Sequence, residues 1–230
     1  MGSNKRTARI AGLLYLIIVF CGIFSLKYVP SKLIVQGNGL ATIRNISTSE
    51  TLFRLGILSE LIGDILFILL PLVLYKLFME VNKTHALLMV SLIIPGILIS
   101  FVNLLNKFVV LTLISKADYL KVFATNYLQA QILLYLDFYN NGNFIAQIFW
   151  GLWLFPFGYL VFKSRFLPKV LGILMMAGCF GYLINFIGSF LFLQYDETII
   201  PRYITLPASI GELGTCLWLL IMGVRDKRTQ

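Results

Sequence analysis

The chain has 230 residues, of which 59% are hydrophobic and only 13% are charged. Soluble domains carry about 25% charged residues, so this composition and the mean hydropathy of +0.87 exclude an ordinary soluble protein. The formal net charge of +9 is large enough to suggest a nucleic-acid partner, and the placement of the basic residues decides that question below.

Six long apolar stretches follow one another along the chain. A helix needs about 20 apolar residues to cross the hydrocarbon layer of a membrane. Backbone groups in lipid must be satisfied internally, and runs of this length are too long for barrel strands. We therefore predict an all-α bundle of six transmembrane helices that uses residues 1–230 as one integral membrane domain. The helices are expected roughly at 8–26, 52–75, 86–112, 143–162, 169–193 and 204–224.

Eleven of the nineteen basic residues form four clusters at alternate ends of these stretches, always on the same side. An excess of Lys and Arg marks the cytoplasmic side of a membrane protein. We therefore predict a multi-pass protein of the cell membrane with both termini in the cytoplasm. Topology accounts for the positive charge, and no nucleic-acid partner is expected. The clusters are Lys5, Arg6 and Arg9; Lys76 and Lys83; Lys163, Arg165 and Lys169; and Arg225, Lys227 and Arg228.

The segments predicted outside the membrane are 27–50, 113–142 and 194–203. Gly37, Asn38 and Gly39 are typical of a loop in the first. Residues Asp118 to Tyr139 are amphipathic at helical spacing, which favours a helix lying flat at the outer interface. We expect it to end at a turn formed by residues 140–142. A helix that docks a partner protein is the alternative interpretation.

Prolines and glycines inside the stretches predict how the helices pack. Pro71, Pro95 and Pro156 each remove a backbone hydrogen bond and favour a kink. Small residues let neighbouring helices approach closely. The glycines expected to do so are Gly151, Gly158, Gly172, Gly178 and Gly181.

Polar side chains inside the crossings need a reason, because an ionisable group at the centre of a membrane helix costs about 2.5–3.5 kcal/mol. Counted at 1.5 Å per residue, nearly all of them lie between the midplane and the outer surface. If they converge, they form one polar pocket that opens outward. The candidate ligand-binding residues are Glu60, Asp64, Asn103, Lys107, Asn185 and Glu212.

Two interpretations of these groups stay open. In the first, they only hold the helices together, with Lys107 paired to Glu60 at about the same depth. In the second, they bind a ligand, because three carboxyl groups face one lysine and two acids are left without a basic partner. Such acids are either protonated or matched by a cation that binds there.

Signatures of enzymes and cofactors are mostly missing from the sequence. Ser189 lacks the Gly-x-Ser-Gly context of an intramembrane serine protease. His85 is the single histidine, which argues against bis-histidine haem and a histidine-based zinc site. Asp64 follows Ile62-Gly63, only half of the Gly-x-Gly-Asp signature of an aspartyl intramembrane protease. We expect no metal, no cofactor and no catalytic residues, and treat an intramembrane enzyme as a minor alternative.

One long motif carries a family resemblance. The run from Ile148 to Asn185, IFWGLWLFPFGYLVFKSRFLPKVLGILMMAGCFGYLIN, resembles the signature of a bacterial and archaeal membrane family, domain of unknown function 4386. Further pieces match in order: 8–16, Asn45-Ile46 with 52–54, and Glu212 with 217–220. The resemblance implies a multi-pass membrane protein and transfers no catalytic residues.

Two hypotheses for function follow. In the first, the protein binds or moves a small solute, an ion or a lipid through the outward-facing polar pocket. In the second, it is a non-catalytic scaffold in contact with membrane lipid, whose polar residues lock the bundle and whose interfacial helix docks a partner.

Overall fold

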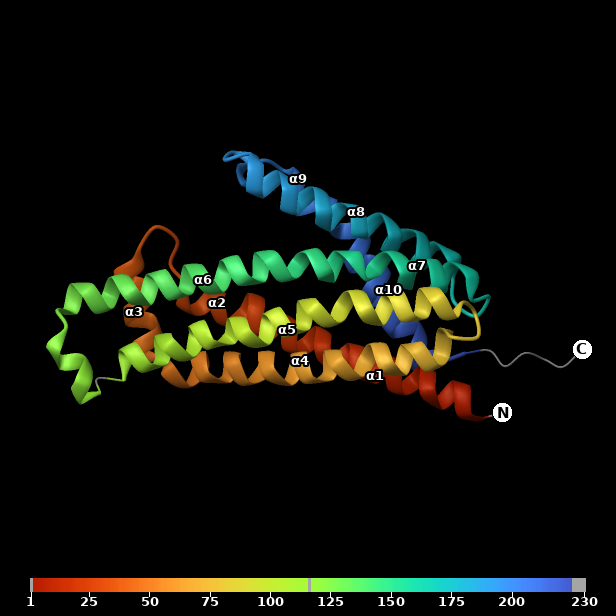
Figure 1. The fold of residues 1–230 in the computed structure, drawn as a ribbon, viewed down its shortest axis with the longest axis horizontal. Helices are drawn as coiled ribbons and strands as arrows, with labels where there is room; N and C mark the ends of the chain where they lie inside the picture. Colours follow the sequence, from red (N-terminus) through yellow and green to blue (C-terminus); the bar gives the residue numbers. More distant parts are fainter. Residues whose placement is uncertain (1, 116, 225–230) are drawn as a thin grey trace, which may run out of the picture. The chain divides into compact units, whose positions relative to one another are not determined.

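The computed structural model describes residues 2–115 and 117–224, and helices but no strands occur among them (Figure 1). This confirms the all-α prediction. In chain order the elements are α1 (Gly2–Ile23), the π-helical η1 (Phe24–Tyr28), α2 (Val29–Leu33), α3 (Gly39–Thr48), α4 (Glu50–Phe78), α5 (Lys83–Ile114), the 3₁₀-helical η2 (Asp118–Val122), α6 (Thr125–Leu152), α7 (Leu154–Lys163), α8 (Lys169–Leu191), the 3₁₀-helical η3 (Tyr195–Glu197), α9 (Ile200–Ile204) and α10 (Leu206–Ile221).

Within the described part of the chain, six helical stretches are long and apolar enough to cross a membrane, as predicted. The chain is therefore a multi-pass membrane protein. The stretches are Asn4–Leu33, Glu50–Phe78, Lys83–Ile114, Thr125–Lys163, Lys169–Leu191 and Ile200–Ile221. The fourth basic cluster, residues 225–228, lies outside the described residues.

The structure corrects the prediction for residues 118–142. No turn forms at 140–142, because α6 continues through them. The segment predicted as a separate interfacial helix divides into η2 and the first part of α6, and the fourth membrane stretch begins at Thr125. The reason is tertiary: Gly142 packs against the side chain of Asn103, and Asn143 accepts a hydrogen bond from it. These residues serve a helix contact and not a turn.

The segment predicted as an outer loop, 27–50, also has more structure than expected. The helix that begins as α1 continues through η1 into α2. Gly37, with a φ of +70°, forms the turn that follows. The side chain of Asn38 then accepts a hydrogen bond from the Ala41 N–H at 3.0 Å, which caps the start of α3. The longest non-helical stretch of this segment is thus residues 34–38.

The chain divides into two compact units. Unit 1 comprises residues 1–17, 66–97 and 145–230, and unit 2 comprises residues 18–65 and 98–144. Four helices, α1, α4, α5 and α6, contribute residues to both. The single domain predicted from the sequence stays a prediction.

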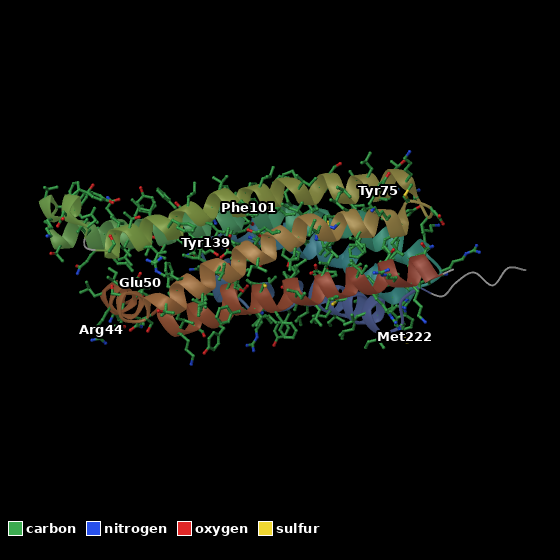
Figure 2. All side chains as sticks on the ribbon, turned by 90° about the horizontal axis from the view of Figure 1, so that it is seen from below. Arg44, Glu50, Tyr75, Phe101, Tyr139 and Met222 are labelled. Atoms are coloured by element: carbon green, nitrogen blue, oxygen red, sulfur yellow. The ribbon has the colours of Figure 1, made fainter. Side chains whose placement is uncertain are left out.

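Unit 2 has a core of apolar side chains from every segment that builds it. Val29 of α2, Ile46 of α3, Phe53 of α4, Leu104 of α5 and Ile132 of α6 are all at least 95% buried. Tyr139 belongs to the same cluster. The short helices α2 and α3 contact each other, and Arg44 projects from α3 at the margin of this unit (Figure 2).

Unit 1 is centred on Trp153, whose side chain is fully buried. Its indole packs against the rings of Tyr15, Phe67 and Phe157, and Phe157 packs in turn edge-on against Phe78. Buried aromatic pairs of this kind contribute about 0.5–1.5 kcal/mol each beyond the burial of their area. Helix α8 packs against both α7 and α10 in this unit.

The glycines predicted to allow close packing in unit 1 do so. A Cβ on Gly158 would lie 2.6 Å from the Gly172 carbonyl oxygen, and one on Gly178 would lie 2.6 Å from Ala208. Gly151 and Gly181 are equally close to Tyr182 and Ile204. Without side chains at these positions, α8 can approach its neighbours to backbone contact.

Pro156 coincides with the interruption between α6 and α7. The nitrogen of a proline cannot donate to the carbonyl four residues earlier, which here belongs to Leu152, the last residue of α6. By contrast, Pro71 and Pro95 lie inside helices that continue through them.

Gly142→Ala should destabilise the protein, whereas Gly22→Ala should not. A Cβ at Gly142 would overlap the Asn103 amide, and such overpacking costs about 1–3 kcal/mol. Gly22 lies in α1, and a Cβ added there would have no neighbour within 4 Å. Alanine is favoured over glycine there by up to about 1 kcal/mol. Unfolding of the detergent-purified variants compares them, and equal stabilities would contradict the close contact at Gly142.

Candidate functional site

An ion pair lies at the centre of the polar residues of unit 2. The Lys107 ammonium donates to Glu60 Oε2 at 2.7 Å, and the two side chains are only 7% and 8% exposed. The Tyr139 hydroxyl donates to both oxygens of the same carboxylate, at 2.7 and 2.8 Å. The ammonium also lies 3.9 Å from the centre of the Tyr139 ring, within the range of a cation–π contact. The pairing of Lys107 with Glu60 considered from the sequence is confirmed.

Helical spacing brings these groups together. Along α4, Phe53, Ile57, Glu60 and Asp64 recur every three or four residues and are all buried. The acids therefore continue the apolar stripe that packs into unit 2. Tyr139 extends the corresponding stripe of α6 and is labelled in Figure 2.

The same spacing on α5 places four buried side chains in one row: Ser100, Asn103, Leu104 and Lys107.

The amide of Asn103 fastens α5 to α6. Its Nδ2 donates to the Tyr139 carbonyl at 2.8 Å and to Asn143 Oδ1 at 3.0 Å. Its Oδ1 accepts from Asn106 Nδ2 at 3.0 Å. A fully bonded amide between membrane helices is typical of a packing contact.

Asp64 differs from Glu60 in its hydrogen bonding. Its side chain is buried, yet Oδ2 has no hydrogen-bond partner among the described residues. Its carboxylate interacts electrostatically with Glu60 and with Lys107. Arg54, which follows Phe53 on α4, pairs instead with exposed Glu50 at 2.6 Å. One lysine thus faces two acids in unit 2, whereas the count from the sequence includes a third, Glu212, which belongs to unit 1.

A cavity of about 650 Å³ lies in unit 2 against this network. Its walls come from α2, the 34–38 turn, α3, α4, α5 and α6. Apolar atoms make up most of the lining surface, with side chains such as Val29, Phe53 and Leu133. Lys107, Tyr139, Asp137 and Asn140 supply polar groups. The cavity therefore joins an apolar chamber to the buried ion pair.

The two remaining candidate residues lie in unit 1. Glu212 of α10 is partly buried, and its Oε1 accepts a hydrogen bond from the buried Tyr15 hydroxyl at 2.6 Å. Asn185 of α8 has a buried Oδ1 without a partner among the described residues. The structure thus brings Glu60, Asp64, Asn103 and Lys107 together in unit 2 and assigns Asn185 and Glu212 to unit 1.

Tyr139 and Tyr15 are the participants that the sequence analysis missed. The amphipathic pattern of residues 118–139 predicts an interfacial position for Tyr139 and not a buried one. The signal was present: Ile132, Leu136 and Tyr139 have the spacing of one buried helix face, and Asn143 continues it.

No group of three or more His, Cys, Asp or Glu side chains able to hold a metal ion occurs in residues 2–115 and 117–224.

Comparison with protein families identifies the chain. The family model described as Domain of unknown function (DUF4386) matches residues 10–223. The chain belongs to this family. The resemblance drawn from the 148–185 motif is thereby confirmed. Neither the curated proteins nor the solved structures contain a match. Membership of the DUF4386 family agrees with the six membrane stretches and assigns no activity to the residues described above.

Removing one partner of the buried pair should be costlier than removing both. Glu60→Gln or Lys107→Met strands a charge and should lower the free energy of unfolding by about 3–5 kcal/mol. The double variant should lose less than the sum, because it strands neither. Unfolding of the purified proteins in a denaturing detergent gives the coupling energy.

The exposed pair Glu50 and Arg54 on the same helix is the matched control. Exposed pairs at this spacing are worth about 0.3–0.5 kcal/mol. A coupling between Glu60 and Lys107 no larger than this would refute a strong buried interaction.

Proposed function

We propose that this membrane protein binds a small lipid-like amphiphile, with an uncharged polar head, in the cavity of unit 2. The observation that carries the proposal is the position of Lys107. Its ammonium contacts Glu60 and the Tyr139 ring, and Lys107 is also one of the residues that line the cavity. Ligand sites in proteins are mostly apolar chambers of about 300–1,000 Å³ with a few placed polar groups. The size and lining of this cavity fit that description.

The charges at the cavity disfavour an anionic head group. Lys107 is neutralised by Glu60, and Asp137 adds a carboxylate to the wall. A ligand carboxylate or phosphate would be repelled by the Asp137 carboxylate. The positive charge of Lys107 would attract it only weakly, because Glu60 already neutralises that charge. A hydroxyl or carbonyl group can accept from the ammonium or from the Asn140 amide, and a hydroxyl can donate to Asp137. The apolar walls suit an acyl or similar hydrocarbon chain.

A scaffold role is the second candidate, and one observation favours it. Every oxygen of Glu60 is bonded within the chain, so the Glu60–Lys107–Tyr139 network needs no ligand to be complete. In that case the three side chains only hold α4, α5 and α6 together. Blocking the cavity without touching the network separates the two candidates.

Leu133→Trp should abolish binding of the amphiphile, and Leu134→Trp should not. Leu133 lines the cavity, whereas its neighbour Leu134 is 41% exposed and is not part of the lining. The probe is a monoacylglycerol with a diazirine in its acyl chain, and labelled peptides are mapped by mass spectrometry. Labelling of residues 29–42 and 133–140 should fall several-fold in Leu133→Trp and in the presence of unlabelled monoacylglycerol.

A fatty acid with the same chain should label these peptides less strongly, because its head is charged. Equal labelling of both tryptophan variants, or labelling without competition, would contradict the proposal and favour the scaffold.

We also propose that the protein lies in the cell membrane with its N-terminus in the cytoplasm. The described basic clusters support this, since Lys76 and Lys83 lie on either side of the α4–α5 turn, and Lys163 and Lys169 on either side of the α7–α8 turn. Both turns should therefore be cytoplasmic.

Cysteine labelling tests this orientation. In a chain whose three native cysteines are replaced, Gln36→Cys should react with a membrane-impermeant maleimide in intact cells. Glu80→Cys should react only after the cells are permeabilised. Both positions are exposed, so their accessibility differs only through the membrane. The reverse pattern would invert the topology.

A further inference from the structure

Two buried oxygen atoms of unit 2 lack hydrogen-bond partners: Oδ2 of Asp64 and Oγ of Ser100. Asp64 is 9% exposed and Ser100 is 2% exposed. Buried polar atoms are almost always bonded, and leaving one unpaired costs about 1–3 kcal/mol, more when the group is charged. Two such atoms in one unit point to a ligand for both.

The two atoms belong to facing stripes of neighbouring helices. The contact between Glu60 and Lys107 sets the register of α4 against α5. The two helices run in opposite directions (Figure 1). Moving one turn from Glu60 to Asp64 on α4 therefore corresponds to moving one turn from Lys107 to Asn103 on α5, and Ser100 follows on the same face one turn further on. The electrostatic interaction of Asp64 with Lys107 agrees with this register.

The charges of this cluster do not balance. Glu60 and Asp64 contribute two negative charges when ionised, and Lys107 contributes one positive charge. The other groups that contact this cluster among the described residues are uncharged: Tyr139 of α6, Asn103 of α5, and Cys21 of α1, which packs beside Gly63. An unbalanced charge in a medium of low dielectric constant is strongly unfavourable. One added positive charge makes the cluster neutral, and two would leave it with a net positive charge.

The chemistry of the free atoms selects the kind of cation. A carboxylate and a hydroxyl are hard oxygen ligands, which suit protons and hard metal ions and not soft ones. Because Glu60 is already paired with Lys107, the unpaired acid leaves a single negative charge, which one monovalent ion balances and a divalent ion does not.

We propose that Asp64 and Ser100 form a binding site for one monovalent cation, either Na⁺ or H⁺. The site neutralises the acid that Lys107 does not pair. It does not depend on the proposed ligand of the cavity, because its atoms are not part of the cavity wall.

The test measures the thermal unfolding midpoint of the detergent-purified protein. Sodium chloride is compared with N-methylglucamine chloride at equal ionic strength, and the pH is varied in the absence of sodium. The wild-type midpoint should rise when sodium is added or when the pH is lowered. Asp64→Asn, which is neutral at every pH, should lose the sodium response and show a smaller response to pH than the wild type.

Two further variants sharpen the result. Asp118→Asn makes the same chemical change at a carboxylate of unit 2 that is 94% exposed, and it should retain the wild-type responses. Ser100→Ala should weaken the sodium response and leave the proton response intact. If sodium raises the midpoint and Ser100→Ala weakens that rise, the bound cation is Na⁺. If the midpoint responds to pH and not to sodium, the bound cation is H⁺.

Wild-type protein provides a measurement that needs no variant. If sodium displaces a proton from Asp64, adding sodium chloride to a weakly buffered sample should release up to one proton per molecule. A midpoint indifferent to both cations would overturn the proposal. So would an Asp64→Asn variant that responds like the wild type.

Discussion

The burial of Lys107 and Glu60 in a membrane-spanning part of the chain constrains the rest of unit 2. Neither charge is tolerable in hydrocarbon alone, so α4 and α5 must present them to each other. Tyr139 then has to face the same point, because its hydroxyl bonds both carboxylate oxygens. One ion pair thus fixes the register and the facing sides of three helices, which apolar contacts alone would specify only loosely.

The remaining polar groups of unit 2 differ in how fully they are bonded. The Asn103 amide uses both its hydrogens and its oxygen, and Gly142 leaves the space that it occupies. Such a saturated group explains the packing of α5 on α6 and leaves nothing for a ligand. Asp64 and Ser100 have unused atoms, and Lys107 borders a cavity. Function is therefore to be sought where hydrogen bonding is incomplete.

Much of this could be predicted from the sequence, because hydropathy and depth in the membrane are encoded locally. The six membrane stretches and the pairing of Glu60 with Lys107 followed from those two properties. The continuity of α6 did not follow. Asn140-Asn141-Gly142 is typical of a turn, and the contact with Asn103 that keeps the helix intact is made from another helix. The depth of a residue in the membrane also does not tell which residues contact it. Depth alone therefore groups Glu212 with Asp64, although the two belong to different units.

The buried acids of the two units differ in whether a positively charged partner accompanies them. Glu212 in unit 1 accepts from a neutral hydroxyl, that of Tyr15, and such a bond is available to the carboxyl whether or not it carries a proton. Glu60 has the same kind of bond from Tyr139, yet unit 2 adds a lysine, and beside the lysine a second acid. A hydrogen bond between a tyrosine and a carboxyl group is enough to hold two helices together, as Tyr15 and Glu212 show in unit 1. The lysine borders the cavity and also interacts with Asp64, so a change in the charge at Asp64 alters the field at the wall of the cavity. Lys107 is therefore the residue through which a bound cation and a bound amphiphile would influence each other.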